Sequence, residues 1–133
     1  MRIALLSYAF VALGGALGAM ARYAIQVWLQ RGVEFPWGTL AANLSGCLLL
    51  GIVAQLVAGS AWFNEAGIIP DQYRLLFAVG FCGSFTTFST YILELHTMVE
   101  KGEVLYAFSY FAASMIGGFA LFFVGLLATR SML

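Results

Sequence analysis

The stretch Gly80-Phe81-Cys82-Gly83-Ser84-Phe85-Thr86-Thr87-Phe88-Ser89-Thr90 places glycines, hydroxyl side chains and phenylalanine rings inside a long apolar run. The charge-free residues 75–93 around it are numerous enough for a membrane-crossing helix. In hydrocarbon, a helix is broken only where the freed N–H and C=O groups line a cavity or bind a ligand. We therefore predict a third transmembrane helix that is broken near residues 80–87, and a functional site for a small polar ligand at the break.

The composition is that of an integral membrane protein. Of 133 residues, 62% are hydrophobic and 9% are charged, whereas soluble domains are about 45–50% apolar. The charges leave four uncharged runs, each close to or above the roughly 20 residues that a membrane-spanning helix requires. The sequence predicts one all-α transmembrane domain, residues 1–133, with helices at about 4–30, 37–60, 74–98 and 104–129.

The connections between these helices carry recognisable signals. Pro36 is suited to opening the second helix. Trp62 and Tyr73 flank the longest polar connection and resemble the aromatic anchors found at membrane interfaces.

The distribution of basic residues gives the chain little preference for one orientation in the membrane. Four spans place both termini on one side, which would carry Arg2, Arg74 and Arg130, while the opposite side would carry Arg31 and Lys101. Positive charge normally marks the cytoplasmic face, and here the two faces nearly balance. Both orientations are therefore possible, which would permit an antiparallel dual-topology homodimer. Such a pair could enclose a pore that four short helices alone could not.

Polar side chains within the spans are the candidate site residues. Thr39 and Asn43 lie four residues apart on one face of the second helix, although Asn43 could instead hold two helices together by hydrogen bonds. Arg22, late in the first helix, either extends its charge to the interface or attracts anions to a vestibule. The fourth helix carries a stripe of hydroxyls at four-residue spacing, formed by Tyr106, Tyr110 and Ser114.

Several classes of function are disfavoured. A net charge of zero without a basic cluster argues against nucleic acid as a partner. One histidine and two cysteines do not make a side-chain metal site. No nucleophile has a clear neighbouring base, so we do not expect an enzyme. We interpret Glu94 and His96 as polar residues toward the end of the third helix.

The remaining chemistry indicates a small anion as the ligand. Hydroxyls and an amide can donate hydrogen bonds, and the edges of aromatic rings carry partial positive charge. Neutral donors suit conduction better than buried cations, because an ion that binds must also leave.

Three motifs together resemble the Fluc/CrcB family of fluoride channels over essentially the whole chain: residues 14–23, then Thr39 with Asn43 and Gly46, then residues 80–90 followed by Glu94. The resemblance implies passive export of fluoride, which lowers cytoplasmic fluoride. It also implies a multi-pass protein of a bacterial inner (plasma) membrane, assembled as an antiparallel homodimer with two pores that are each lined by both subunits.

The resemblance further implies roles for individual residues. The fluoride pore would be lined by Phe85, Phe88, Asn43, Thr39, Tyr106, Tyr110 and Ser114, with Arg22, Thr86 and Thr87 in the vestibule. A structural Na⁺ at the dimer two-fold axis would be held by the backbone carbonyls of Gly80 and Gly83, and no organic cofactor is implied. Alternatively, the two phenylalanines fill the core and the two glycines only allow close packing.

Two other functions compete with this interpretation. A small dual-topology multidrug exporter also has four short helices, but it would be expected to carry an acidic residue in the first helix, and this chain has none there. A non-transporting membrane scaffold subunit would not need polar stripes that converge on a broken helix.

Overall fold

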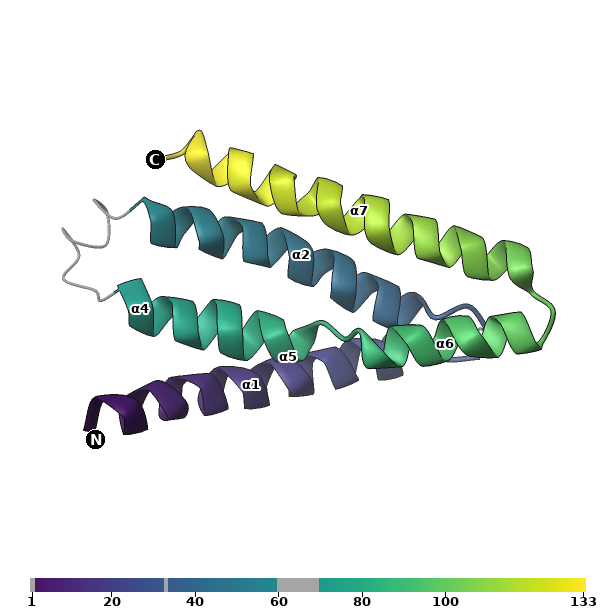
Figure 1. The fold of residues 1–133 in the computed structure, drawn as a ribbon, viewed down its shortest axis with the longest axis horizontal. Helices are drawn as coiled ribbons and strands as arrows, with labels where there is room; N and C mark the ends of the chain where they lie inside the picture. The colour runs from purple at the N-terminus through teal and green to yellow at the C-terminus, as the bar shows by residue number, and fades with distance from the viewer. Residues whose placement is uncertain (1, 33, 60–69) are drawn as a thin grey trace.

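The described part of the chain folds into four long antiparallel helices, of which the third is interrupted (Figure 1). The computed structural model describes residues 2–32, 34–59 and 70–133. Two unbroken helices come first, α1 (Arg2–Leu29) and α2 (Trp37–Ala58), and α7 (Val104–Arg130) comes last. Between them, the third helix is built from α4 (Pro70–Tyr73), η1 (Arg74–Cys82), α5 (Gly83–Phe85) and α6 (Ser89–Glu100).

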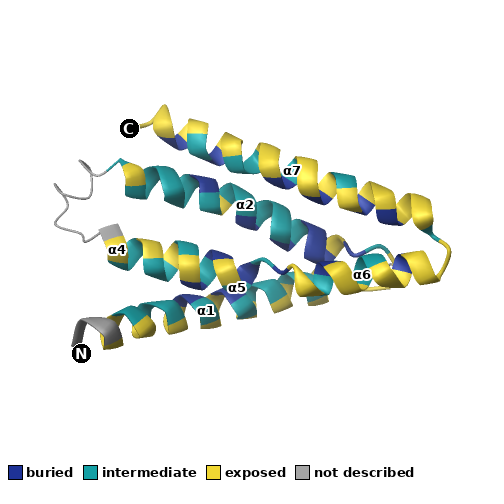
Figure 2. Ribbon diagram, in the orientation of Figure 1, coloured by how far each residue is buried: buried dark blue, intermediate teal, exposed yellow. Residues whose placement is uncertain are grey.

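Among the residues that the structure describes, four segments are long and apolar enough to cross a membrane: Leu5–Leu29, Trp37–Ala58, Asp71–Glu100 and Val104–Arg130. Exposed residues run along the outer faces of the helices (Figure 2). Large apolar side chains are among the exposed residues, for example Leu105, Ile116 and Phe119. Such a surface is stable only against lipid or a partner protein. The prediction of an all-α, multi-pass membrane protein is confirmed.

The turns fix the order of the helices. Pro36 directly precedes α2, and Gly32 and Gly102 adopt positive φ angles of 72° and 77° in the two turns at one end of the bundle. Both termini lie at the opposite end (Figure 1). The predicted anchor Trp62 and residue 60, the predicted end of the second helix, lie outside the described residues.

Glycines allow the helices to pack closely. A Cβ atom at Gly14 or Gly18 of α1 would collide with the backbone of η1, and one at Gly51 or Gly125 would collide across the contact between α2 and α7. Small residues at helix contacts are the usual way in which membrane helices approach each other. In Figure 1, α2 consequently lies between α7 and the third helix, and α1 packs against η1 and α5.

The third helix is broken, as predicted, but the break lies later in the sequence than the predicted start at residue 80. The non-helical residues are Thr86, Thr87 and Phe88, and Thr86 is extended with φ −83° and ψ 153°. Gly80 is helical because its missing side chain lets α1 approach, since a Cβ there would lie 2.8 Å from the carbonyl oxygen of Val11. The segment before the break is a wide π-helix, a form that often marks functional sites.

Candidate functional site

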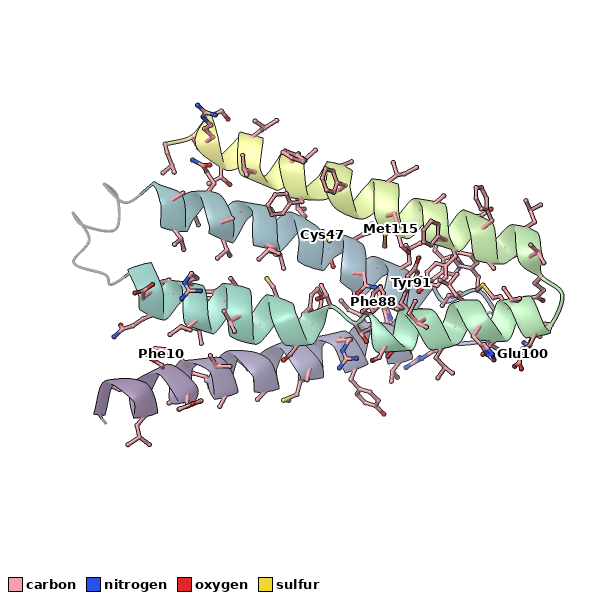
Figure 3. All side chains as sticks on the ribbon, viewed as in Figure 1. Phe10, Cys47, Phe88, Tyr91, Glu100 and Met115 are labelled. Carbon is pink, nitrogen blue, oxygen red and sulfur yellow. The ribbon has the colours of Figure 1, made fainter. Side chains whose placement is uncertain are left out.

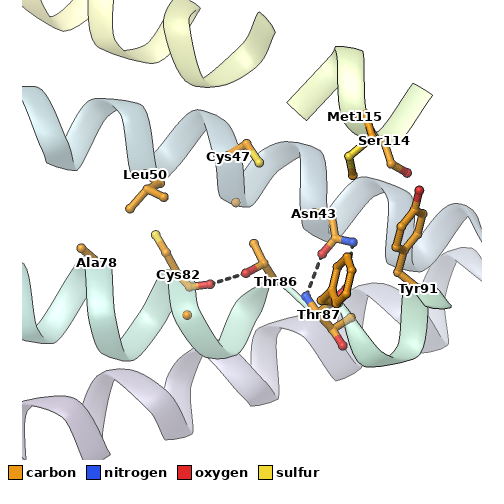
Figure 4. Close-up of a pocket in the computed structure, with 13 residues that line it drawn as sticks. Asn43, Cys47, Leu50, Ala78, Cys82, Thr86, Thr87, Tyr91, Ser114 and Met115 are labelled. Carbon is orange, nitrogen blue, oxygen red and sulfur yellow. Dashed lines mark hydrogen bonds between the residues drawn. The ribbon is translucent and has the colours of Figure 1, made fainter. Parts of the chain in front are cut away.

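Asn43 of α2 holds the broken backbone in place. Its side-chain amide donates to the carbonyl of Thr87 at 3.1 Å, and the N–H of Thr87 donates to Asn43 Oδ1 at 2.8 Å. One amide thus satisfies both backbone groups of a residue that lies outside any helix, as the apolar surroundings require. Figure 4 shows this pair beside the gap between α5 and α6.

The threonines at the break complete its hydrogen bonding. Thr86 Oγ1 donates to the carbonyl of Cys82 at 2.9 Å, and Thr87 Oγ1 donates to Thr90 Oγ1 at 3.0 Å. The N–H of Thr90 donates in turn to Thr87 Oγ1 at 3.4 Å. Thr87 thus precedes the N-cap residue Phe88 and accepts from an N–H in the first turn of α6, and the hydroxyls stabilise the break rather than merely interrupting the helix.

The two phenylalanines at the break have different surroundings. Phe85 is buried, stacks on Phe81 with ring centroids 5.3 Å apart, and faces Gly46, where a Cβ would displace the Thr86 methyl group. Phe88 is 71% exposed on the protomer. A single protomer therefore presents one of these rings outward and keeps the other inside.

A cavity of about 310 Å³ lies against the break. It brings together six residues predicted for the site: Asn43, Gly83, Thr86, Thr87, Phe88 and Ser114. Its lining contains no charged side chain. Figure 3 shows that Cys47, Phe88, Tyr91 and Met115 gather between α2, the third helix and α7, whereas Glu100 lies at the outer end of α6.

Glu94 lies at the centre of a second polar cluster. Thr39 Oγ1 donates to one carboxylate oxygen at 2.7 Å, and Tyr110 OH donates to the other at 2.7 Å. Gln26 Nε2 donates to Thr39 Oγ1 at 3.1 Å. The interpretation of Glu94 as a polar helix-end residue is therefore wrong, because its carboxylate joins α2 to α7. His96 is exposed, and its Nδ1 lies 3.5 Å from Oε2 of Glu100.

Replacing Glu94 tests this cluster. We expect Glu94→Ala to lower the free energy of unfolding by about 1–3 kcal/mol, because two hydrogen bonds between helices are lost and two hydroxyls are left without an acceptor. Glu100→Ala is the matched control, since Glu100 is exposed on the same helix. Thermal unfolding in detergent compares the two variants, and equal stability would mean that the cluster does not hold the helices together.

The remaining predicted residues are not brought to the cavity. Tyr106 is 62% exposed and lines a separate hollow of about 200 Å³ with Glu34 and Glu103. Tyr110 is completely buried, and its ring packs against the ring of Phe35 with centroids 5.5 Å apart. The Nε atom of Arg22 is buried and has no hydrogen-bond partner among the described residues.

The two carbonyl groups predicted to hold Na⁺ differ in whether a backbone N–H donates to them. The carbonyl of Gly80 lies within reach of the N–H of Gly83. The carbonyl of Gly83 lacks its α-helical donor, because the N–H of Thr87 is directed to Asn43, and no backbone N–H of residues 86–88 donates to it. Gly83 also lines the cavity, so a freed carbonyl oxygen is present and fits a hard cation.

Comparison with known proteins places the chain in a family. The family described as "CrcB-like protein, Camphor Resistance (CrcB)" matches residues 9–126. A protein of Chlorobium phaeobacteroides is 40% identical over 117 residues, which cover 87% of each chain. A protein of Rhizobium etli is 41% identical over 124 residues, covering 92% of this chain and 94% of the relative.

A third relative, from Leptospira interrogans, is 38% identical over 121 residues, covering 90% of this chain and 91% of the relative. All three are named "Fluoride-specific ion channel FluC". The matched residues include the broken third helix, Asn43 and the cavity. The chain belongs to the CrcB/FluC family of fluoride-specific ion channels.

Proposed function

We propose that this protein is a channel that conducts fluoride passively across the membrane and so lowers fluoride in the cytoplasm. The observation that carries the proposal is the uncharged break in the third helix, where Asn43 holds Thr87 beside the exposed ring of Phe88. The names of the relatives support fluoride as the ion. A cavity between candidate membrane-spanning helices and without a charged lining suits a conducted ion rather than a trapped one.

The chemistry of the break fits a small, strongly hydrated anion. Fluoride loses water only where donors replace it at close range, and the polar groups here are neutral amides and hydroxyls. The positive edge of the Phe88 ring adds a weak attraction. Neutral groups of this kind let the anion leave as readily as it enters.

We infer that two copies of the chain assemble in opposite orientations to complete the path. Phe88 and the cavity lie on an open face of the protomer, and an isolated protomer would expose them to lipid. The nearly balanced basic residues of the two faces allow both orientations. In such a dimer, Phe88 would border the ion with Asn43 beside it, whereas Phe85 is buried against Phe81 and does not line the cavity.

The same inference assigns the outer parts of the path. Thr39 and Tyr110 donate to the Glu94 carboxylate, which follows the break along the third helix, and Ser114 lines the cavity together with Asn43. Tyr106 would stand at the mouth of the pore, while Arg22, Thr86 and Thr87 would border the vestibule.

We also propose a structural Na⁺ at the dimer two-fold axis. The carbonyls of Gly83 and Gly80 from both subunits would hold the ion, and a bound cation would compensate for the Gly83 oxygen, which the break leaves without a donor. Because a Cβ at Gly83 would meet nothing closer than the Ala78 carbonyl at 3.8 Å, packing alone does not explain this glycine.

Removing sodium is expected to inactivate the channel. The purified protein would be reconstituted after prolonged dialysis into a sodium-free buffer containing N-methyl-D-glucamine, and we expect fluoride flux and the thermal unfolding temperature to fall together and to recover when sodium returns. Unchanged flux and unfolding after sodium removal would exclude the Na⁺ site.

Efflux from liposomes tests the function itself. Liposomes that hold the purified protein are loaded with potassium fluoride or potassium chloride, and valinomycin is added to carry the compensating potassium. We expect rapid loss of fluoride, negligible loss of chloride, and no loss from protein-free liposomes. Equal loss of the two halides would contradict a fluoride-selective channel.

A further inference from the structure

Three sulfur-bearing side chains line the cavity beside the break. Cys47 lies on α2, Cys82 is the last residue of η1, and Met115 lies on α7. The chain has only two cysteines, so all of its thiols are at this one cavity. Figure 4 shows the three side chains around the hollow between α2, the third helix and α7.

The thiol of Cys47 packs against the part of α7 that carries Met115. Cys47 follows Asn43 by one helical turn on α2, so both side chains share the face that lines the cavity. The Sγ atom of Cys47 reaches α7 at Gly118, where an added Cβ would lie 3.3 Å from it. Met115 precedes Gly118 by three residues and is therefore on the same face of α7. Two sulfur atoms from different helices thus meet one side of the cavity.

Cys82 supplies the second thiol from the third helix. It is 3% exposed, and its carbonyl accepts from Thr86 Oγ1 at 2.9 Å, which fixes it one turn before the break. The thiols of Cys47 and Cys82 are near enough to act on each other electrostatically. Both are free rather than joined in a disulfide. Each can therefore offer its sulfur to a ligand in the cavity.

This set of donors selects a soft metal cation. Thiolate and thioether sulfur bind copper(I) well, whereas hard cations prefer oxygen. Within the described ranges, no three side chains of His, Cys, Asp or Glu come together, so the thioether of Met115 is needed as the third donor. We propose that Cys47, Cys82 and Met115 form a binding site for a soft monovalent cation of the copper(I) or silver(I) class.

Binding of such a cation leaves the cavity electrically neutral. One thiol gives its proton to water as its sulfur bonds to the metal, so the charges of the thiolate and the cation cancel. The second thiol and the thioether remain neutral donors, and no electron is transferred. A neutral complex is what apolar surroundings require, because an unpaired charge there is costly.

The bound metal would also obstruct the proposed fluoride path. The cavity of about 310 Å³ that holds the three sulfur atoms is lined by Asn43 and Phe88 as well. A metal ion bonded to three helices would fill part of this space and hold the helices together. Metal binding does not depend on the proposed function, whereas the block of fluoride rests on it.

Silver binding to the full chain tests the site. Silver nitrate would be titrated into the purified protein in chloride-free detergent solution without a thiol reductant, and native mass spectrometry would count the bound ions. We expect one silver ion per chain. The affinity of Cys47→Ala and of Cys82→Ala should fall at least about tenfold, because even groups that only support a metal ligand contribute that much. Met115→Leu should weaken binding in the same direction.

Two results of this titration would refute the site. The first is two silver ions per chain, with each single-cysteine variant keeping one at unchanged affinity, because the thiols would then bind separately. The second is the absence of bound silver. Met20→Leu is the matched control for Met115→Leu, since Met20 is exposed on α1, and it should bind silver like the original protein.

Fluoride efflux in the presence of silver tests the obstruction. At a silver concentration about ten times the dissociation constant, mass action leaves about a tenth of the sites free, so efflux should fall about tenfold. The control Cys47→Ala/Cys82→Ala/Ser131→Cys carries a thiol only at the exposed end of α7, and silver should not slow its efflux. Undiminished efflux of the original protein with silver bound would refute the obstruction. If it carries no fluoride even without silver, the proposed function fails, and the silver count still decides the metal site.

Discussion

Asn43→Asp is expected to reduce fluoride flux at least about 100-fold, because it places a negative charge at the break through which the anion passes. Two like charges 4 Å apart repel by about 4 kcal/mol at an effective dielectric constant of about 20, and each 1.4 kcal/mol corresponds to about a tenfold change in rate. The substitution nearly preserves size and shape. It can still accept from the Thr87 N–H but loses the bond to the Thr87 carbonyl.

The matched control is Gln55→Glu, which makes the same amide-to-carboxylate change on the same helix. Gln55 lies three turns further along α2 and does not line the cavity. Liposome efflux of fluoride, measured on samples that elute as the same oligomer, compares the two. Fast efflux through the Asn43→Asp variant would place the fluoride path away from the break.

The number and type of helices could be predicted from the sequence because they depend on local composition. Uncharged runs of sufficient length are enough to specify membrane spans, and the observed α2 and α7 begin at the residues expected, Trp37 and Val104. The i, i+4 spacing of Thr39 and Asn43 indicated that both share one face of the second helix, and the structure shows that this face contacts Glu94 and Thr87 of the third helix.

The position of the break could not be predicted in this way. Glycine weakens a helix, which is why residues 80–87 were expected to open, but Gly80 is held in the helix by close contact with α1. The helix ends instead where Asn43 takes the N–H of Thr87, a contact between residues 44 positions apart. A local sequence pattern cannot predict a contact between residues so far apart in the chain.

The partners of one polar group, the Glu94 carboxylate, were missed for the same reason. In the sequence, Glu94 lies toward the end of the predicted third helix. Only the packing of α2 and α7 against that helix brings the two donors to its carboxylate. A costly charge at that depth was the available signal that partners must exist.

The ring of Phe88 offers the most direct comparison for the path itself. Phe88 and Phe119 are both 71% exposed on the protomer, but only Phe88 lines the cavity. Isoleucine preserves apolar bulk at either position while removing the polarised ring edge. If fluoride meets this edge, the same substitution must have different effects at the two positions.

The decisive measurement is the fluoride conductance of Phe88→Ile against that of Phe119→Ile in planar bilayers. We predict that the conductance of Phe88→Ile falls about tenfold. The substitution removes an aromatic contact of about 1 kcal/mol, and it also removes the fit between the ring and the pore. The conductance of Phe119→Ile should stay within about twofold of the original, a range that corresponds to less than about 0.5 kcal/mol. Equal conductance for both variants would contradict a fluoride path through the broken third helix.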